Sequence, residues 1–197
     1  MDVMLDLETM GVGSDAAIVA IGAVEFSLEK GMGEIFYMPV DLESSVKSGG
    51  VIDAMTVVWW MSQSEEARAT FKEPSSLIGV ALAQFSRWIS SLGPDSDIKI
   101  WGNGAAFDNV VLSNAYRRYG LPRPWRYSGD RCYRTLKALC PNVPIPQYGT
   151  SHCAKDDAVS QAMHTIDILW ELKRTVFLPE GLGKTPLSIV GDDYLDQ

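Results

Sequence analysis

Two acidic side chains share one face of residues 3–9, which the alternation of apolar residues predicts to be the first β-strand. Side chains alternate along a strand, so Asp6 and Glu8 point one way while Leu5 and Leu7 point the other. Two carboxylates about 4 Å apart repel by roughly 4 kcal/mol at an effective dielectric near 20, and a divalent cation between them would relieve that repulsion. An edge strand that exposes both acids to water would give the same pattern, so both interpretations stay open at this point.

A third acid, Asp108, follows a predicted strand at 98–101 and falls in the first turn of the helix after it. The helix dipole favours a carboxylate there, and the side chain could reach over the end of the strand. Ordinary helix-start chemistry would explain Asp108 equally well.

A histidine and two further acids lie where a loop enters the last predicted helix. His152 precedes that helix and can therefore point in a different direction from Asp156 and Asp157. Histidine titrates near neutral pH and can accept a proton from water, although a loop histidine without a role is the alternative. The helical wheel does not choose between the two acids. His164, inside the helix, has no acidic partner at a useful spacing and is expected to be at the surface or partly packed.

In this order the three motifs resemble those of the DEDDh exonucleases, a family that includes ribonuclease T, oligoribonuclease and the proofreading subunit of bacterial replicative polymerase. The motifs are Asp-x-Glu on the first strand, Phe-Asp at a strand-to-helix junction and His-x-Ala-x-x-Asp-Ala at the last helix, and the resemblance covers about residues 1–172. It looks closest to phage exonucleases of the DexA type, on residues 56–60, 63–68, 104–108 and 152–156.

The resemblance implies a ribonuclease H-like fold and a metal-dependent 3′→5′ exonuclease that releases nucleoside 5′-monophosphates by a two-metal-ion mechanism. The implied metal ligands are Asp6, Glu8, Asp108 and Asp157. His152 is the implied general base, and the family's five-residue spacing from it selects Asp157 rather than Asp156. Oxygen ligands suit Mg²⁺ or Mn²⁺, and the absence of clustered cysteines and histidines argues against zinc.

Nucleotide contacts are expected on both sides of the first motif's strand end. By resemblance, the small residues Thr9, Met10 and Gly11 would let backbone N–H groups approach a terminal 3′-hydroxyl. Phe107 could stack on a base or pack in the core. Trp59 and Trp60 are adjacent on a predicted helix capped by Asp53 and so point about 100° apart; one is expected in the core and the other as a stacking platform.

The chain departs from the family pattern at two positions. Many relatives carry Asn where this chain has Gly104, with Asn103 one residue earlier, so nucleotide contacts of that Asn are not transferred. Relatives often carry an acid where this chain has Cys132, and the supporting role of that acid is not transferred either.

Basic residues are concentrated in one stretch although the formal net charge is −8. A negative chain does not suit a protein that coats long nucleic acid by counterion release alone. Seven of the 17 basic residues are Arg117, Arg118, Arg123, Arg126, Arg131, Arg134 and Lys137. They predict a phosphate-contacting rim beside the acidic centre, or else an ordinary solvated surface.

Periodicity and turn signals predict the elements that must position these residues. Three strands come first, at 3–9, 18–27 and 34–40, and short glycine-containing turns favour antiparallel pairing. Helices are predicted at 77–92, 107–118, 133–139 and 153–172, and further strands at 98–101 and 127–130. This order predicts an α/β domain with a mixed central sheet of about five strands, the first three antiparallel, flanked by helices. The last helix is expected to bury Val159, Ala162, Met163, Ile166, Leu169 and Trp170.

The sequence also predicts the extent of the domain and the location of the protein in the cell. Residues 1–175 are predicted to form one exonuclease domain and 176–197 a C-terminal tail. No apolar stretch reaches the roughly 20 residues of a membrane helix, no signal peptide is recognisable, and the three cysteines form no CxxC pair. A cytoplasmic protein, bacterial or in a phage-infected host, without membrane contact is therefore expected.

The expected partner is nucleic acid with a 3′ end, single-stranded DNA or RNA, and the sequence does not decide between the two sugars because the pocket's treatment of the 2′-OH decides it. A homodimer is left open, and a separate polymerase partner is not expected. Two alternatives remain: a ribonuclease H-like endonuclease, and a non-catalytic nucleic-acid-binding module of the same fold.

Overall fold

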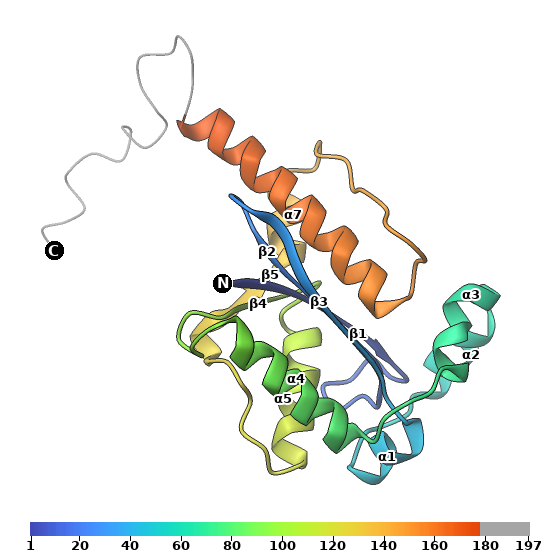
Figure 1. The fold of residues 1–197 in the computed structure, drawn as a ribbon. Helices are drawn as coiled ribbons and strands as arrows, with labels where there is room; N and C mark the ends of the chain where they lie inside the picture. Colours follow the sequence, from blue (N-terminus) through green and yellow to red (C-terminus); the bar gives the residue numbers. More distant parts are fainter. Residues whose placement is uncertain (178–197) are drawn as a thin grey trace, which may run out of the picture.

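A five-stranded mixed sheet forms the centre of the computed structural model, which describes residues 1–177 (Figure 1). The strands are β1 (Asp2–Thr9), β2 (Ile18–Ser27), β3 (Gly31–Pro39), β4 (Lys99–Gly102) and β5 (Asp130–Cys132). Their order in the sheet is β3-β2-β1-β4-β5, with β1–β2 and β2–β3 antiparallel and β1–β4 and β4–β5 parallel. This confirms the predicted mixed α/β sheet. Because β1 is the central strand, Asp6 and Glu8 do not lie on a sheet edge.

The helices cover both faces of the sheet, α7 on one side and α4 and α5 on the other (Figure 1). They are α1 (Leu42–Lys47), α2 (Ala54–Met61), α3 (Glu65–Arg68), α4 (Ile78–Leu92), α5 (Asp108–Arg118), α6 (Tyr133–Leu139) and α7 (Ala154–Phe177). Short 3₁₀ turns occupy Ala69–Lys72 and Tyr127–Gly129. None of the helices within residues 1–177 is both long and apolar enough to cross a membrane.

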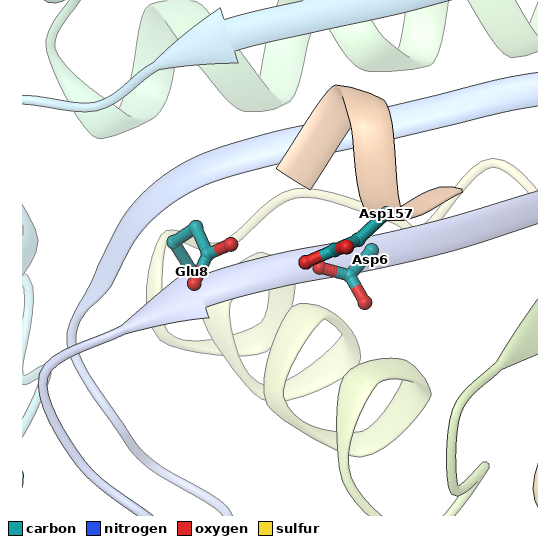
Figure 2. Close-up of side chains that lie close together, drawn as sticks. All are labelled: Asp6, Glu8 and Asp157. Carbon is teal, nitrogen blue, oxygen red and sulfur yellow. The ribbon is translucent and has the colours of Figure 1, made fainter. Parts of the chain in front are cut away.

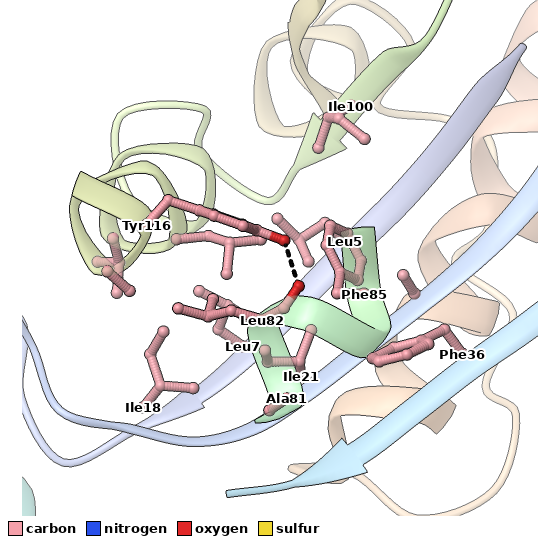
Figure 3. Close-up of a cluster of buried hydrophobic side chains, with 14 of the residues drawn as sticks. Leu5, Leu7, Ile18, Ile21, Phe36, Ala81, Leu82, Phe85, Ile100 and Tyr116 are labelled. Atoms are coloured by element: carbon pink, nitrogen blue, oxygen red, sulfur yellow. Dashed lines mark hydrogen bonds between the residues drawn. The ribbon is translucent and has the colours of Figure 1, made fainter. Parts of the chain in front are cut away.

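Alternation along β1 divides its side chains between two cores. Leu5 and Leu7 pack beneath α4 and α5 in the larger core (Figure 3). Tyr116 of α5 donates its hydroxyl hydrogen bond to the Leu82 carbonyl of α4 at 2.8 Å, which fixes these two helices to each other. Met4 faces the smaller core under α7. Asp6 and Glu8 follow Met4 on the same face, so the strand itself directs both carboxylates toward α7.

Most predicted elements are confirmed, with shifts at their ends. Asp53 caps α2 as expected, its Oδ1 accepting from the backbone N–H of Thr56 at 2.9 Å. The strand expected at 127–130 begins only at Asp130, because the residues before it turn through a 3₁₀ helix. The last helix begins at Ala154 and continues to Phe177. The proposed boundary at 175/176 therefore falls inside α7, and residues 178–197 of the expected tail lie outside the described residues.

The buried face of α7 is more polar than its apolar period predicts. His164 is 1% exposed, so the expectation of a surface or partly packed position is wrong. Its Nδ1 lies 2.7 Å from the Tyr133 hydroxyl and its Nε2 3.0 Å from the Val143 carbonyl, so both ring nitrogens are satisfied inside the protein. Met163 and Trp170, expected in the core, are instead 37% and 49% exposed. Because its hydrogen bonds are satisfied, a polar residue such as His164 can be buried on α7. The spacing of apolar residues in the sequence does not predict this burial.

Candidate active site

Four carboxylates from three elements line one cavity. Ligand oxygens of Asp6, Glu8 and Asp157 all lie within 4.8 Å of one another, with the first two on β1 and the third on the first turn of α7 (Figure 2). Asp108 opens α5 and accepts a hydrogen bond from the Leu7 N–H at 3.3 Å, which ties it to the same stretch of β1. The cavity has a volume of about 500 Å³, and it is lined by Asp6, Leu7, Glu8, Trp59, Asn103, Phe107, Asp108, Arg134, His152, Asp157 and Gln161.

A glycine on β2 allows α7 to approach the sheet at this point. Gly22 pairs with Asp6 in the β1–β2 register. A Cβ on Gly22 would lie 2.1 Å from the backbone carbonyl carbon of Ala154. This distance is too short for any residue with a side chain at position 22. The first turn of α7 therefore rests directly on the strand beside Asp6. This contact brings Asp157, which is far from Asp6 in sequence, next to it in space.

The two neighbouring acids at the start of α7 have different environments. Asp157 points into the cavity, and its Oδ2 accepts from the His152 N–H at 2.8 Å. Asp156 points away and accepts from the Thr150 N–H at 2.9 Å. It also packs against Gly149, whose φ of 60° is in the left-handed region. The structure thus places Asp157 with the other carboxylates, whereas Asp156 stabilises the turn before the helix.

The histidine of the third motif is held at the cavity in a strained conformation. His152 has a φ of 64°, the only positive φ of a non-glycine residue within residues 1–177. Its backbone is fixed by Asp157, and its ring meets Trp59 edge-on with ring centroids 4.9 Å apart. Trp60 lies farther away, at 6.4 Å. Strained backbone geometry of this kind persists only where surrounding contacts enforce it, and such positions cluster at functional sites.

The electrostatics of the cavity favour a bound cation. Burial, and secondarily repulsion from Asp108, Glu8 and Asp157, raise the pKa of Asp6 well above its usual range. Burial, together with repulsion from Asp157 and Asp108, raises the pKa of Glu8 to about 8. Burial raises the pKa of Asp108 to about 6, against the hydrogen bond from the Leu7 N–H, and burial also raises the pKa of Asp157.

One carboxylate oxygen in this cavity has no hydrogen-bond partner within residues 1–177. Glu8 is 6% exposed, and its buried Oε1 is that atom. A buried, unpaired carboxylate oxygen is unfavourable unless something positive meets it. The donor set consists of carboxylate oxygens, which suit a hard divalent cation such as Mg²⁺ or Mn²⁺. The residues present therefore fit the metal that the motifs imply.

A second cavity, of about 540 Å³, adjoins the first and is mainly apolar. Its lining comprises Leu7, Glu8, Thr9, Gly11, Val12, Asp53, Met55, Thr56, Trp59, Trp60 and Phe107. Four of these residues also line the carboxylate cavity, namely Leu7, Glu8, Trp59 and Phe107. Trp60 is 3% exposed and donates from Nε1 to the Thr9 carbonyl at 2.9 Å, whereas Trp59 is 41% exposed. The expected division between a core tryptophan and an accessible one is thus confirmed, with Trp59 the accessible one.

Met10 differs from its two predicted neighbours. Thr9 and Gly11 line the apolar cavity, but the Met10 side chain is buried in a separate small core. Its backbone N–H is donated to the Ala17 carbonyl at 2.8 Å and is therefore not available to a ligand. The expectation that Met10 would present its N–H to a terminal hydroxyl is wrong, because this N–H is bonded to the Ala17 carbonyl just beyond the end of β1.

Two residues at the site were not predicted individually from the sequence. Gln161 lies one turn after Asp157 on α7 and donates from Nε2 to Asp6 Oδ1 at 2.7 Å. Its i+4 spacing from Asp157 is the signal that could have identified it. Arg134 was expected only as a member of the basic stretch, yet it lines the carboxylate cavity itself. No local sequence signal distinguishes it from the arginines beside it.

Three other arginines of the basic stretch make contacts elsewhere. Arg123 lies 3.6 Å from Asp130, and Arg131 donates to the carbonyls of Ser128 and Asp130 at 2.9 Å. Arg126 pairs with Asp95 at 3.6 Å. These contacts direct the three guanidinium groups toward the protein, so they do not form one continuous row beside the carboxylates.

Comparison with known families agrees with this geometry. Residues 1–169 match the model of the family described as the 3′-5′ exoribonuclease Rv2179c-like domain. The chain belongs to this family. A protein of Enterobacteria phage T4 named exodeoxyribonuclease is 28% identical over 129 residues, which are 59% of this chain and 56% of that protein. The chain thus spans about half the length of this curated relative.

Solved structures share the fold. E. coli exonuclease I in complex with a dT13 oligonucleotide superimposes with a TM-score of 0.56 and 16% identity, over 87% of this chain and 40% of that chain. The nuclease domain of 3′hExo, a DEDDh family member bound to rAMP, gives a TM-score of 0.56 and 12% identity, over 86% and 92% of the two chains. Family membership confirms the resemblance inferred from the motifs, and these structures confirm the ribonuclease H-like fold.

Proposed function

We propose that this protein is a metal-dependent 3′→5′ exonuclease that removes nucleoside 5′-monophosphates from the 3′ end of single-stranded DNA or RNA. The observation that carries the proposal is the meeting of four carboxylates and His152 in one cavity that opens beside an apolar one. The family to which the chain belongs, described as 3′-5′ exoribonuclease, supports the same activity.

The carboxylates would hold two divalent ions, Mg²⁺ or Mn²⁺. The residues that would bind them are Asp6, Glu8, Asp108 and Asp157. When bound, such ions activate water and stabilise the charge that develops on the phosphate and the departing oxygen. Gln161 holds the Asp6 carboxylate in position, and the backbone of Leu7 does the same for Asp108. Ligands oriented in this way need little rearrangement when the ions bind.

His152 would act as the general base that accepts the proton of the attacking water. Its backbone is tied to Asp157 and its ring is braced by Trp59, so the imidazole stays at the edge of the carboxylate cavity. Positioning matters because proton transfer requires the base to be within hydrogen-bond reach of the water. The enforced left-handed backbone at His152 is consistent with such a fixed position.

The apolar cavity would receive the terminal nucleoside. Trp59 and Phe107 line both cavities and could stack against its base, while Thr9 and Gly11 lie at the end of β1 where the sugar would come close. Trp60 supports this wall from inside through its bond to Thr9. A nucleoside bound here would place its 5′-phosphate over the carboxylates, which is the arrangement that removal of single nucleotides from a 3′ end requires.

The comparisons name enzymes of both DNA and RNA. The family is described as exoribonuclease and the phage relative is named exodeoxyribonuclease. We propose that residues 1–177, through Phe177 of α7, form the catalytic domain and that it acts in the cytoplasm without a polymerase partner.

The deciding experiment is a time course on 5′-labelled single- and double-stranded DNA and RNA, with Mg²⁺, Mn²⁺ or EDTA. A ladder that shortens from the 3′ end, depends on metal and yields nucleoside 5′-monophosphates is expected. Cleavage of a closed circular single strand would instead indicate an endonuclease. Binding without any hydrolysis would indicate a non-catalytic module.

A further inference from the structure

A single arginine stands among the carboxylates without forming an ion pair. Arg134 is the one lysine or arginine among the described residues that line the carboxylate cavity, and it is exposed. Its Nη2 donates to the Asn103 carbonyl at 2.6 Å, and within residues 1–177 it has no carboxylate partner within 4.0 Å. A guanidinium group carries five N–H donors, so most of them remain available to a ligand.

Gly104 makes room for this guanidinium group. Gly104 has a φ of 117°, and a Cβ built on it would lie 3.3 Å from both Cζ and Nη2 of Arg134. The group therefore rests against the backbone of the loop between β4 and α5, where a side chain at position 104 would crowd it. The lack of a side chain at position 104 and the location of Arg134 are thus parts of one arrangement.

The neighbouring arginine shows that this location is not a general property of the basic stretch. Arg131 uses its Nη1 for two backbone carbonyls, those of Ser128 and Asp130, each at 2.9 Å. Its guanidinium group stabilises the turn before β5. Arg134, by contrast, keeps its charge directed at a cavity, and a fixed, unneutralised charge of this kind is suited to an anionic ligand.

The position of Arg134 along the two cavities indicates which part of the ligand it meets. Arg134 lines the carboxylate cavity but not the apolar one, whereas Trp59 and Phe107 line both. A nucleoside in the apolar cavity would place its 5′-phosphate in the carboxylate cavity, which Arg134 also lines. A polyanion entering a cavity of four carboxylates also needs a positive group there, and a guanidinium fork matches two phosphate oxygens.

We propose that Arg134 binds the non-bridging oxygens of the scissile phosphodiester. The inference rests on the proposed function, because it assumes that a 3′-terminal nucleotide occupies the two cavities. Arg134 would then orient the phosphate, and it would remain in contact with the 5′-phosphate of the released nucleotide.

Product binding tests this contact without turnover. With Mg²⁺ present, affinities for AMP and adenosine, and for dAMP and deoxyadenosine, are measured by calorimetry. Arg134→Ala should weaken binding of both monophosphates by about 10- to 100-fold, as expected for loss of a charged hydrogen bond, and leave the nucleosides unchanged. Arg134→Lys should recover part of the loss. Arg87→Ala, which removes an exposed arginine on α4, is the matched control and should change nothing.

Turnover of a small substrate shows whether Arg134 contacts the scissile phosphate or an upstream one. The p-nitrophenyl ester of thymidine 5′-monophosphate carries a scissile phosphodiester and no upstream nucleotide. Arg134→Ala should slow its hydrolysis as strongly as it slows that of an oligonucleotide. If only the oligonucleotide reaction slows, Arg134 contacts an upstream phosphate, and the proposal is overturned.

The two proposals fail in different ways. A wild-type protein that hydrolyses neither substrate contradicts the proposed function. An active wild type whose Arg134→Ala variant melts at the same temperature, binds AMP equally well and turns over the ester at the same rate contradicts only the role of Arg134.

Discussion

At the scale of single residues, the two neighbouring acids of α7 give the sharpest contrast. Asp157 lies in the carboxylate cavity, and Asp156 stabilises the turn that precedes the helix. Asp157→Asn keeps the acceptor for the His152 N–H but removes a negative ligand, so we expect turnover to fall at least about 100-fold with little change in melting temperature. Asp156→Asn should reduce turnover far less. Rates and melting curves of the two variants decide, and the reverse order would mean that Asp156 is the ligand.

Substitution of His152 tests the proposed general base rather than the metal ligands. Removal of a positioned general base lowers turnover by roughly 10²- to 10⁴-fold, and we expect a loss of this size for His152→Ala. Metal affinity, measured by calorimetry with Mn²⁺, should survive because the histidine is not a ligand. At saturating metal, the wild-type rate should fall in acid, since a protonated imidazole cannot accept the proton of water, and the variant should lose that acidic fall. Loss of metal affinity together with activity would show that His152 serves the metal instead.

At the scale of elements, local patterns predicted the pieces well. The two-residue period of β1 placed Asp6 and Glu8 on one face, and Asp53 identified the start of α2. These features depend only on neighbouring residues, so the sequence is sufficient to find them. The strained backbone of His152 and the buried position of His164 depend on contacts between distant segments, and no local pattern encodes them.

The contact between β2 and α7 is the element-scale feature on which the site depends. Gly22→Ala would place a Cβ against the backbone of Ala154, and neither backbone can move away without shifting the start of α7. Overpacking of this kind destabilises by about 1–3 kcal/mol, and it should also displace Asp157 from Asp6. We therefore expect a lower melting temperature and a disproportionate loss of metal affinity.

Gly13→Ala is the control for that substitution. A Cβ on Gly13 would meet only the Asp15 carboxylate at 3.0 Å, and this is the end of an exposed side chain that can move. Its stability and metal affinity should match the wild type. If Gly22→Ala also binds metal as the wild type does, then the approach of α7 to the sheet does not determine the geometry of the site.

At the scale of the whole molecule, negative charge is concentrated in the carboxylate cavity. The chain carries a net charge of −8, and four of its acids converge on one cavity within the described residues. The seven basic residues at positions 117–137 do not compensate for them as a group, because Arg123 and Arg126 pair with acids elsewhere. A cation bound in the cavity would offset this concentration of like charge, so metal binding and stability should be coupled.

This coupling has a definite pH dependence. The folded protein raises the pKa of Glu8 to about 8 and that of Asp6 well above its usual range, whereas unfolded carboxyl groups titrate near 4. Between about pH 4.5 and 8, the metal-free folded state therefore holds protons that the unfolded state releases. Stability from these groups is fully present below the unfolded pKa and is lost as the pH rises through the folded pKa.

We therefore expect the melting temperature of chelated protein to include a component that falls between pH 5 and pH 8. Mg²⁺ or Mn²⁺ binds the deprotonated carboxylates of the folded state, so the gain in melting temperature from millimolar metal should grow over the same range. Glu8→Gln, a neutral isostere, should flatten the fall in chelated protein and make it more stable than the wild type at pH 8, while reducing the gain from metal. Melting curves in EDTA and in Mg²⁺ at several pH values measure both effects. A gain from metal that is absent, or that is equal at pH 5 and pH 8, would show that the carboxylates do not converge in solution as they do in the structure.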